Sequence, residues 1–230
     1  MTVLPPFTAH NIALPDGTRT GPAGELLAES SVCLTALGLL DEQFAGEDRS
    51  QVTVADLGCL EAGYTAAFAQ AGYQATGVEA RSANMGKCRL VADALKLPNM
   101  VFIQDDARNL EARGLAFDAV FCCGLLYHLD QPAAFLRMLG RITRRLLIVQ
   151  SHYSVSCAEE NEGYRGHWYQ DHPEESDLWG SWGNQQSFWL GHGELLRAMA
   201  DAGFTDVRAV DDGTWSDRET FTGLKSPQGG

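Results

Sequence analysis

From residue 51 onward, the chain alternates between short apolar runs and segments with helical spacing. Apolar runs of strand character cover residues 52–56, 74–79, 101–104, 116–122 and 146–150. Helical signals lie between them, at residues 64–71, 82–95, 107–112 and 130–142. Regular alternation of strand and helix predicts an α/β fold: a single doubly wound, mostly parallel sheet with helices on both faces.

The segments outside this alternation complete the expected organisation. We interpret residues 1–230 as a single domain, in which residues 51–150 form the ligand-binding core. Residues 1–50 form a leader with a turn at Asp16-Gly17 and a cap helix over about 24–44. Residues 151–190 are rich in aromatic and acidic residues, and we expect them to form a substrate lid. Residues 191–223 contain a helix followed by strands, one of which runs antiparallel to the others.

Composition and charge exclude several classes of protein. A chain of 230 residues with 45% hydrophobic and 20% charged residues has an ordinary globular composition. No apolar run approaches the roughly 20 residues of a membrane span, and the N-terminus has no signal-peptide pattern. The six cysteines show no framework spacing, so we expect reduced thiols and a cytoplasmic location. A net charge of −13 disfavours nucleic acid as a partner.

The most informative loop follows the first predicted strand. This strand ends at Asp56, and a turn of small residues from Gly58 to Gly63 leads into the next helix. In nucleotide-type sites, such a turn faces the ligand together with the N-terminus of the helix. Leu60 and Ala62 occupy positions where glycines are expected. Because side chains disfavour positive φ, we expect Leu60 to keep ordinary angles and the turn to follow a different path, with Gly63 supplying flexibility.

Polar or small residues also follow the next three strands. Ligands of parallel sheets bind at the carboxyl ends of the strands, so these residues are expected to meet. Glu79 ends the second strand, 23 residues after Asp56, a distance that suits hydrogen bonds to ribose hydroxyls. Asp106 follows the third strand, where it could bind the ligand or simply cap the short helix that follows. The chain offers no basic clamp for a pyrophosphate, which disfavours NAD.

Together these elements resemble the class I S-adenosylmethionine-dependent methyltransferases over roughly residues 53–149. The first motif is similar to Asp56-Leu57-Gly58-Cys59-Leu60-Glu61-Ala62-Gly63, and the family's adenine-reading element is similar to Asp105-Asp106-Ala107. The resemblance implies S-adenosylmethionine (SAM) as cofactor, with Glu79 on its ribose. Glu61 either reaches the α-amino group of the ligand or points to solvent. The implied cofactor-binding residues are Asp56, Gly58, Cys59, Leu60, Glu61, Glu79, Ala80, Asp105, Asp106, Ala107, Cys123 and Gly124.

The fourth motif narrows the resemblance to a subgroup. Residues 124–129 read Gly-Leu-Leu-Tyr-His-Leu, and the tRNA-wobble carboxymethyltransferases contain a related motif. The leader segment from His10 to Thr18 also resembles that subgroup. The same motif occurs in many small-molecule methyltransferases, so it leaves the acceptor open.

Methyl transfer to oxygen or nitrogen needs alignment and, in many cases, a base. His128 and His152 follow the fourth and fifth strands, and we take both as candidate catalytic residues. His128 could equally hold its loop in place by packing. A metal site of His152, His167 and His172 is disfavoured because the residues have no ligand spacing. The candidate substrate-binding residues are Tyr127, His128, His152, Tyr153, His167, Trp168 and Trp189.

These observations favour a SAM-dependent methyltransferase that acts on a small molecule, at O or N. The expected partners are this acceptor and, as a possible assembly, a second copy in a homodimer, with no nucleic acid and no membrane. Two alternatives stay open. One is a tRNA-modifying methyl or carboxymethyl transferase, and the other is a SAM-binding fold repurposed for non-methylating chemistry.

Overall fold

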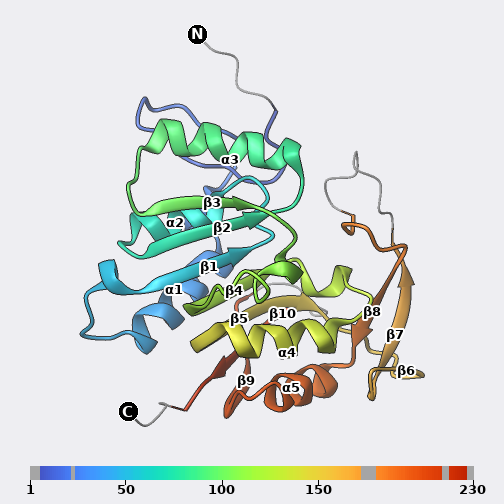
Figure 1. The fold of residues 1–230 in the computed structure, drawn as a ribbon. Helices are drawn as coiled ribbons and strands as arrows, with labels where there is room; N and C mark the ends of the chain where they lie inside the picture. Colours follow the sequence, from blue (N-terminus) through green and yellow to red (C-terminus); the bar gives the residue numbers. More distant parts are fainter. Residues whose placement is uncertain (1–5, 22–23, 172–179, 214–217, 227–230) are drawn as a thin grey trace. The chain divides into compact units, whose positions relative to one another are not determined.

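The computed structural model describes residues 6–21, 24–171, 180–213 and 218–226. The chain divides into two compact units, Met1–Ala107 and Arg108–Gly230, and each is described by itself (Figure 1). The interpretation as a single domain stays a prediction.

The first unit is built on three parallel strands in the order β3-β2-β1. Their side chains are largely buried in β1 and β2, as expected for strands covered by other elements. In the register, Asp56 lies opposite Gly77 and Glu79 opposite Gln104, so the strand ends form one edge. The bounds are Thr53–Leu57 for β1, Gln74–Glu79 for β2 and Met100–Gln104 for β3.

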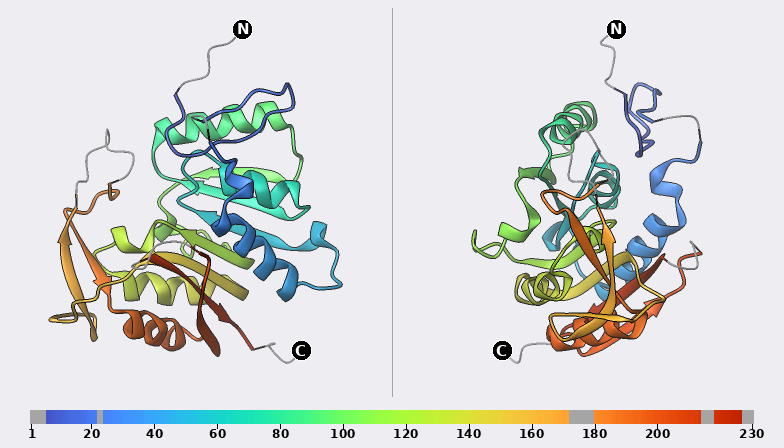
Figure 2. Two further views of the ribbon diagram at one scale, coloured as in Figure 1. Left: turned by 180° about the vertical axis from the view of Figure 1, so that it is seen from behind. Right: turned by 90° about the vertical axis from the view of Figure 1, so that its right-hand side faces the viewer.

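Helices of the first unit begin where the sequence offers a cap or a turn. The expected single helix over 24–44 is interrupted, because Ser30 has extended backbone angles and its hydroxyl accepts the N–H of Cys33 at the start of α1. The leader, dark blue in Figure 2, runs beside α3 and α2. The bounds are Leu27–Glu29 for η1, Ser31–Gln43 for α1, Arg49–Gln51 for η2, Gly63–Gln70 for α2, Ser82–Leu95 for α3 and Ala107–Asn109 for η3.

The second unit combines parallel and antiparallel strands in the order β4-β5-β10-β9. β4 and β5 are parallel, whereas β10 runs antiparallel to both β5 and β9. Helix α4 begins at Pro132, a favoured first helical residue, and packs beside α5. The bounds are Phe117–Cys123 for β4, Leu126–His128 for η4, Pro132–Ile142 for α4, Thr143–His152 for β5, His192–Asp201 for α5, Asp206–Val210 for β9 and Arg218–Leu224 for β10.

The expected lid contains regular structure that the sequence pattern did not reveal. Three antiparallel strands, β6 (Glu159–Asn161), β7 (Tyr164–Gln170) and β8 (Gln186–Leu190), form a separate small sheet. His172 and Trp179 lie outside the described residues. The parallel strands joined through helices, with the antiparallel strands near the C-terminus, confirm the predicted α/β, mostly parallel fold. Within the described ranges, none of the helices has the length and apolarity needed to cross a membrane.

Candidate functional site

The loop after β1 has three residues with left-handed backbone angles, and two of them are not glycines. Gly58, Leu60 and Ala62 have φ angles of 69°, 51° and 72°. The expectation that Leu60 keeps ordinary angles is therefore wrong, as is the expectation of flexibility at Gly63, which is the first residue of α2. Left-handed angles cost a non-glycine residue on the order of 1–2 kcal/mol. The surrounding structure must offset this cost at Leu60 and Ala62.

Hydrogen bonds hold Leu60 in this conformation. Its N–H donates to Glu79 Oε2 at 3.1 Å, and its carbonyl accepts from Cys88 Sγ at 3.3 Å. Cys59 is buried behind the loop, and its N–H donates to Val78 O at 3.0 Å. The turn is thus attached to both the end of β2 and the helix α3.

Asp56 is buried under the loop and bonds to the helix that follows it. Its side chain is 1% exposed, and its Oδ2 accepts the Thr65 hydroxyl at 2.6 Å. Burial raises the pKa of Asp56 to about 7, although the bond from Thr65 opposes this shift. Asp56 thus joins β1 to α2, and its expected contact with a ligand stays a prediction.

Glu79 has the properties expected of a ribose-binding carboxylate. Oε1 accepts the Arg81 N–H at 2.7 Å and Oε2 accepts the Leu60 N–H at 3.1 Å. Burial raises its pKa, with the backbone of Arg81 and the side chain of Asn84 among the groups that oppose the shift. Because a carboxylate has about four acceptor positions, Glu79 can still accept a further donor such as a hydroxyl. Ala80 lies directly between Glu79 and Arg81.

The end of β3 lies beside Glu79, as predicted. The Asp105 N–H donates to the Glu79 carbonyl at 3.1 Å, and the Asp106 N–H donates to Asp105 Oδ1 at 2.7 Å. Ala107 is buried and begins η3. The structure therefore brings Leu60, Glu79 and Asp105 together at the ends of the strands.

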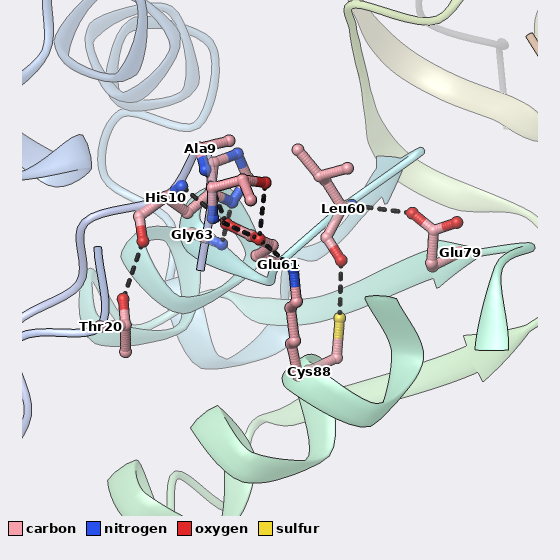
Figure 3. A network of polar contacts seen from close by, with 10 residues as sticks. Ala9, His10, Thr20, Leu60, Glu61, Gly63, Glu79 and Cys88 are labelled. Atoms are coloured by element: carbon pink, nitrogen blue, oxygen red, sulfur yellow. Dashed lines mark hydrogen bonds and ion pairs between the residues drawn. The ribbon is translucent and has the colours of Figure 1, made fainter. Parts of the chain in front are cut away.

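Glu61 corrects another expectation. Its carboxylate is fully buried and faces the N-terminal leader (Figure 3). Oε1 accepts the Thr8 N–H at 2.9 Å, and Oε2 accepts the N–H groups of Ala9 and His10 at 3.0 and 2.8 Å. Because both oxygens are bonded within the protein, Glu61 neither points to solvent nor presents its carboxylate to an α-amino group.

In the second unit, the end of β4 turns sharply at Gly124. This residue has a φ of 71°, and its N–H donates to Gln150 O at 3.0 Å. Cys123 Sγ lies 3.5 Å from Gln150 Oε1, which also accepts from Arg218 Nε at 2.5 Å. Cys123 and Gly124 are thus tied to the neighbouring strand β5 and to β10.

An aromatic cluster, formed by Tyr127, His152, Tyr169 and Trp189, lies in the same unit. The His152 and Trp189 rings are stacked, with centroids 4.9 Å apart and planes 15° from parallel. Tyr127 meets His152 edge-on at 4.8 Å, and Tyr169 lies 4.1 Å from Trp189. Tyr127, His152 and Trp189, which are remote in sequence, are brought together here. Tyr169 comes from the segment that we expected to form the lid.

His128 is paired with an acid that the sequence did not single out. Its Nδ1 lies 3.0 Å from Asp171 Oδ2, while Asp171 Oδ1 accepts the Ser181 N–H at 3.0 Å. Donation from Nδ1 to this carboxylate leaves Nε2 as the proton acceptor. Among seven acids in the insertion, nothing in the local pattern distinguished Asp171, because its partner is 43 residues away.

The remaining predicted acceptor residues have other surroundings. Tyr153 packs against His192 and its hydroxyl donates to Glu219, while the His167 ring lies against the Glu159 carboxylate. Trp168 lies opposite Phe188 in the register, whereas His167 lies opposite Trp189. Successive strand residues face opposite sides, so Trp168 faces away from the aromatic cluster. Trp168 is therefore not part of that cluster, and its predicted role in substrate binding stays a prediction.

A metal centre finds no support in the part of the chain that the structure describes. Among the described residues, we find no group of three or more His, Cys, Asp or Glu side chains that could hold a metal ion.

Comparison with known proteins agrees with this geometry. Residues 55–146 match a family model described as "Methyltransferase domain". No curated protein matches the sequence significantly.

Solved structures match nearly the whole chain. The N-terminal domain of EvdMO1 with SAH bound is 25% identical, with a TM-score of 0.76 over 92% of this chain and 89% of that one. The same domain in the presence of SAH and D-fucose is 24% identical, with a TM-score of 0.75 over 92% of this chain and 88% of that one. Magnesium protoporphyrin IX methyltransferase from Synechocystis PCC 6803 with bound SAM is 17% identical, with a TM-score of 0.60 over 85% of this chain and 80% of that one. Residues 55–146 are thus similar to a methyltransferase domain, and the similar solved structures share a Rossmann-like methyltransferase fold with this chain. Both findings agree with the predicted enzyme class and with SAM as its cofactor. The subgroup with the Gly-Leu-Leu-Tyr-His-Leu motif stays a prediction.

Proposed function

We propose that this protein transfers a methyl group from SAM to an oxygen or nitrogen of a small molecule with an apolar or aromatic ring. The observation that supports this cofactor is Glu79, a buried carboxylate at the end of β2 that accepts the N–H of Leu60 in the left-handed turn. The methyltransferase domain match over residues 55–146 supports the same cofactor.

Within the first unit, we assign the cofactor to the ends of β1, β2 and β3. Glu79 would hold the ribose hydroxyls, and the segment from Asp105 to Ala107 would line the adenine. The backbone at Gly58 and Leu60 gives the ligand close approach. When bound, SAM supplies an electrophilic methyl group on a sulfonium.

Within the second unit, we assign acceptor binding to the aromatic cluster and proton removal to His128. Stacked and edge-on rings offer a flat apolar surface for a ring-shaped acceptor. Asp171 fixes His128 in the tautomer whose Nε2 can take a proton from a hydroxyl or ammonium group. His152 is part of the aromatic cluster, and its stacking on Trp189 favours acceptor positioning over proton transfer.

Calorimetric titration with SAM and S-adenosylhomocysteine tests the cofactor. Glu79→Ala should weaken binding by roughly 100-fold, because it removes charge-assisted bonds and leaves the Leu60 N–H unpaired. Glu111→Ala is the matched control, since this exposed acid pairs with Arg141 in the other unit of the chain. Absence of wild-type binding at millimolar ligand would contradict the proposed cofactor.

Isotopic methyl transfer over an acceptor panel tests the reaction. The panel should include phenols, aromatic amines and deoxysugars, the last because a similar structure was solved in the presence of D-fucose. Transfer to tRNA would instead support the tRNA-modifying alternative. Tight binding of SAM without transfer to any acceptor would favour a repurposed SAM-binding fold.

A further inference from the structure

The leader is joined to the turn after β1 through a single buried carboxylate. Glu61 accepts three consecutive backbone N–H groups, those of Thr8, Ala9 and His10, at 2.8–3.0 Å. A carboxylate in this position acts on the leader as an anion acts on the N–H groups of a helix N-terminus. The contact spans more than 50 residues of sequence.

A buried cation completes the charge at Glu61. Lys87 Nζ, from α3, lies 2.6 Å from Glu61 Oε1, and the Lys87 side chain is 9% exposed. The same ammonium lies 5.7 Å from the centre of the Phe7 ring. A fully buried ion pair stabilises only where its remaining hydrogen bonds are satisfied, and the leader's N–H groups satisfy those of Glu61.

A second contact fixes the leader to α2. The Gly63 N–H donates to His10 Nδ1 at 2.9 Å, and the His10 carbonyl accepts from the Thr20 hydroxyl at 2.8 Å (Figure 3). A Cβ at Gly63 would lie 2.8 Å from His10 Nδ1 and 2.3 Å from Leu27 Cδ2. Gly63 is thus required for the close approach of the leader rather than for flexibility.

The position of Glu61 explains why two non-glycine residues can be left-handed. Glu61 lies between Leu60 and Ala62, whose φ angles are 51° and 72°. The leader holds Glu61, and Glu79 holds Leu60. The backbone is therefore held next to both strained residues. External contacts therefore replace the conformational freedom that glycines would supply.

We propose that Glu61, His10 and Lys87 are positioning residues for SAM binding, through which the leader holds the Leu60–Ala62 turn in its ligand-binding form. This inference rests on the proposed function, because the turn is assigned to the cofactor. It makes the leader a part of the cofactor site, and it predicts that ligand binding and leader attachment stabilise each other.

Titration with S-adenosylhomocysteine tests the inference directly. Glu61→Gln should weaken binding roughly tenfold, since the amide places a donor against the leader's N–H groups. The same substitution should cost less than about threefold in a Leu60→Gly, Ala62→Gly background, where the turn no longer needs the contacts. Equal losses in both backgrounds, or no loss in either, would overturn the inference.

Glu162→Gln is the matched control. Glu162 also accepts two consecutive N–H groups, from Ala133 and Ala134, and pairs with Arg137. It lies between β6 and β7, outside the cofactor loop, and its carboxylate bonds to the start of α4, so its substitution should leave the affinity unchanged. A loss equal to that of Glu61→Gln would show a general effect of destabilisation and contradict the positioning role.

Amide hydrogen exchange provides a measurement that does not need the ligand. Glu61→Gln should accelerate exchange at Leu60 and Ala62, and His10→Ala should do so at Gly63 if the first variant fails to fold. Unchanged exchange in folded variants would overturn the inference. If the wild type binds no ligand, the proposed function fails, and the exchange at Leu60 still decides whether the leader holds the turn.

Discussion

The polar cluster around Glu61 and the aromatic cluster around Trp189 solve different physical problems. Around Glu61, every oxygen of the carboxylate has a donor from the leader or from Lys87. Around Trp189, the contacts are between rings, and the buried indole Nε1 has no hydrogen-bond partner among the described residues. A satisfied polar cluster fixes one backbone path, whereas the ring contacts leave the indole N–H without an acceptor among the described residues. The turn after β1 is thus held by satisfied hydrogen bonds, and the aromatic cluster is the surface that we propose for acceptor binding.

Removing the base on the acceptor side should give the largest effect. We expect His128→Gln to lower kcat for methyl transfer by roughly 1000-fold, because a positioned general base contributes about 100- to 10,000-fold. Binding of S-adenosylhomocysteine should be unchanged. Asp171→Asn should lower kcat less and shift the pH profile, since the amide no longer favours the same tautomer. A normal rate in both variants would assign His128 to holding its loop.

The polar cluster should make stability depend on pH. Burial lowers the pKa of His10 from 6.5 to about 4, with Glu61 opposing and Lys87 reinforcing the shift. The unfolded chain binds this proton first, so stability is lost as pH falls from 6.5 towards 4, by about 3 kcal/mol. Urea unfolding should show this loss in the wild type and not in His10→Asn.

Asp56 provides the contrasting case within the same unit. Its pKa is raised from 3.8 to about 7, so its contribution is lost as pH rises through that interval. Asp56→Asn should therefore gain stability relative to the wild type between pH 4 and pH 7, opposite in sign to the His10 effect. Parallel pH profiles for the two variants would contradict this explanation.

Truncating the aromatic surface should have an intermediate effect. We expect Trp189→Ala to raise KM for the acceptor about tenfold, with little change in cofactor affinity, because it removes one stacking partner. Trp168→Ala is the matched control, since Trp168 packs on Phe188 at the opposite face of the small sheet. Equal changes in KM would show that the loss comes from the sheet's stability.

The smallest effect should come from relieving backbone strain. Ala62→Gly should stabilise the protein by about 1 kcal/mol, because glycine adopts a φ of 72° without strain. Ala67→Gly, inside α2, should cost about 1 kcal/mol by the same measurement of unfolding. If both substitutions destabilise equally, the turn is not strained at Ala62.

The elements with strong local signals could be predicted from the sequence. The bounds of β2 and α3 agree with the prediction at both ends, since Glu79 and Ser82 mark the turn between them. The helix break at Ser30 and the sheet of β6, β7 and β8 were missed. Those features depend on a cap and on pairings across the chain, and the insertion has no clear alternation of apolar and polar residues.

The candidate site shows the same division. Glu79 and Asp105 were expected together, because parallel strands end at one edge. The pairing of His128 with Asp171 and that of Glu61 with the leader join residues 43 and more than 50 positions apart. No spacing rule connects residues at such distances.

By itself, the sequence determined the α/β class and the strand-end residues, because these follow from periodicity. Its resemblance to the class I methyltransferases implied SAM as the ligand to test. Only the tertiary structure decided how Leu60 and Ala62 bend, since their φ angles are imposed by contacts with Glu79 and the leader. It also decided which way Glu61 faces and which acid orients His128. Long-range hydrogen bonds determine these features, and a local pattern carries no information about them.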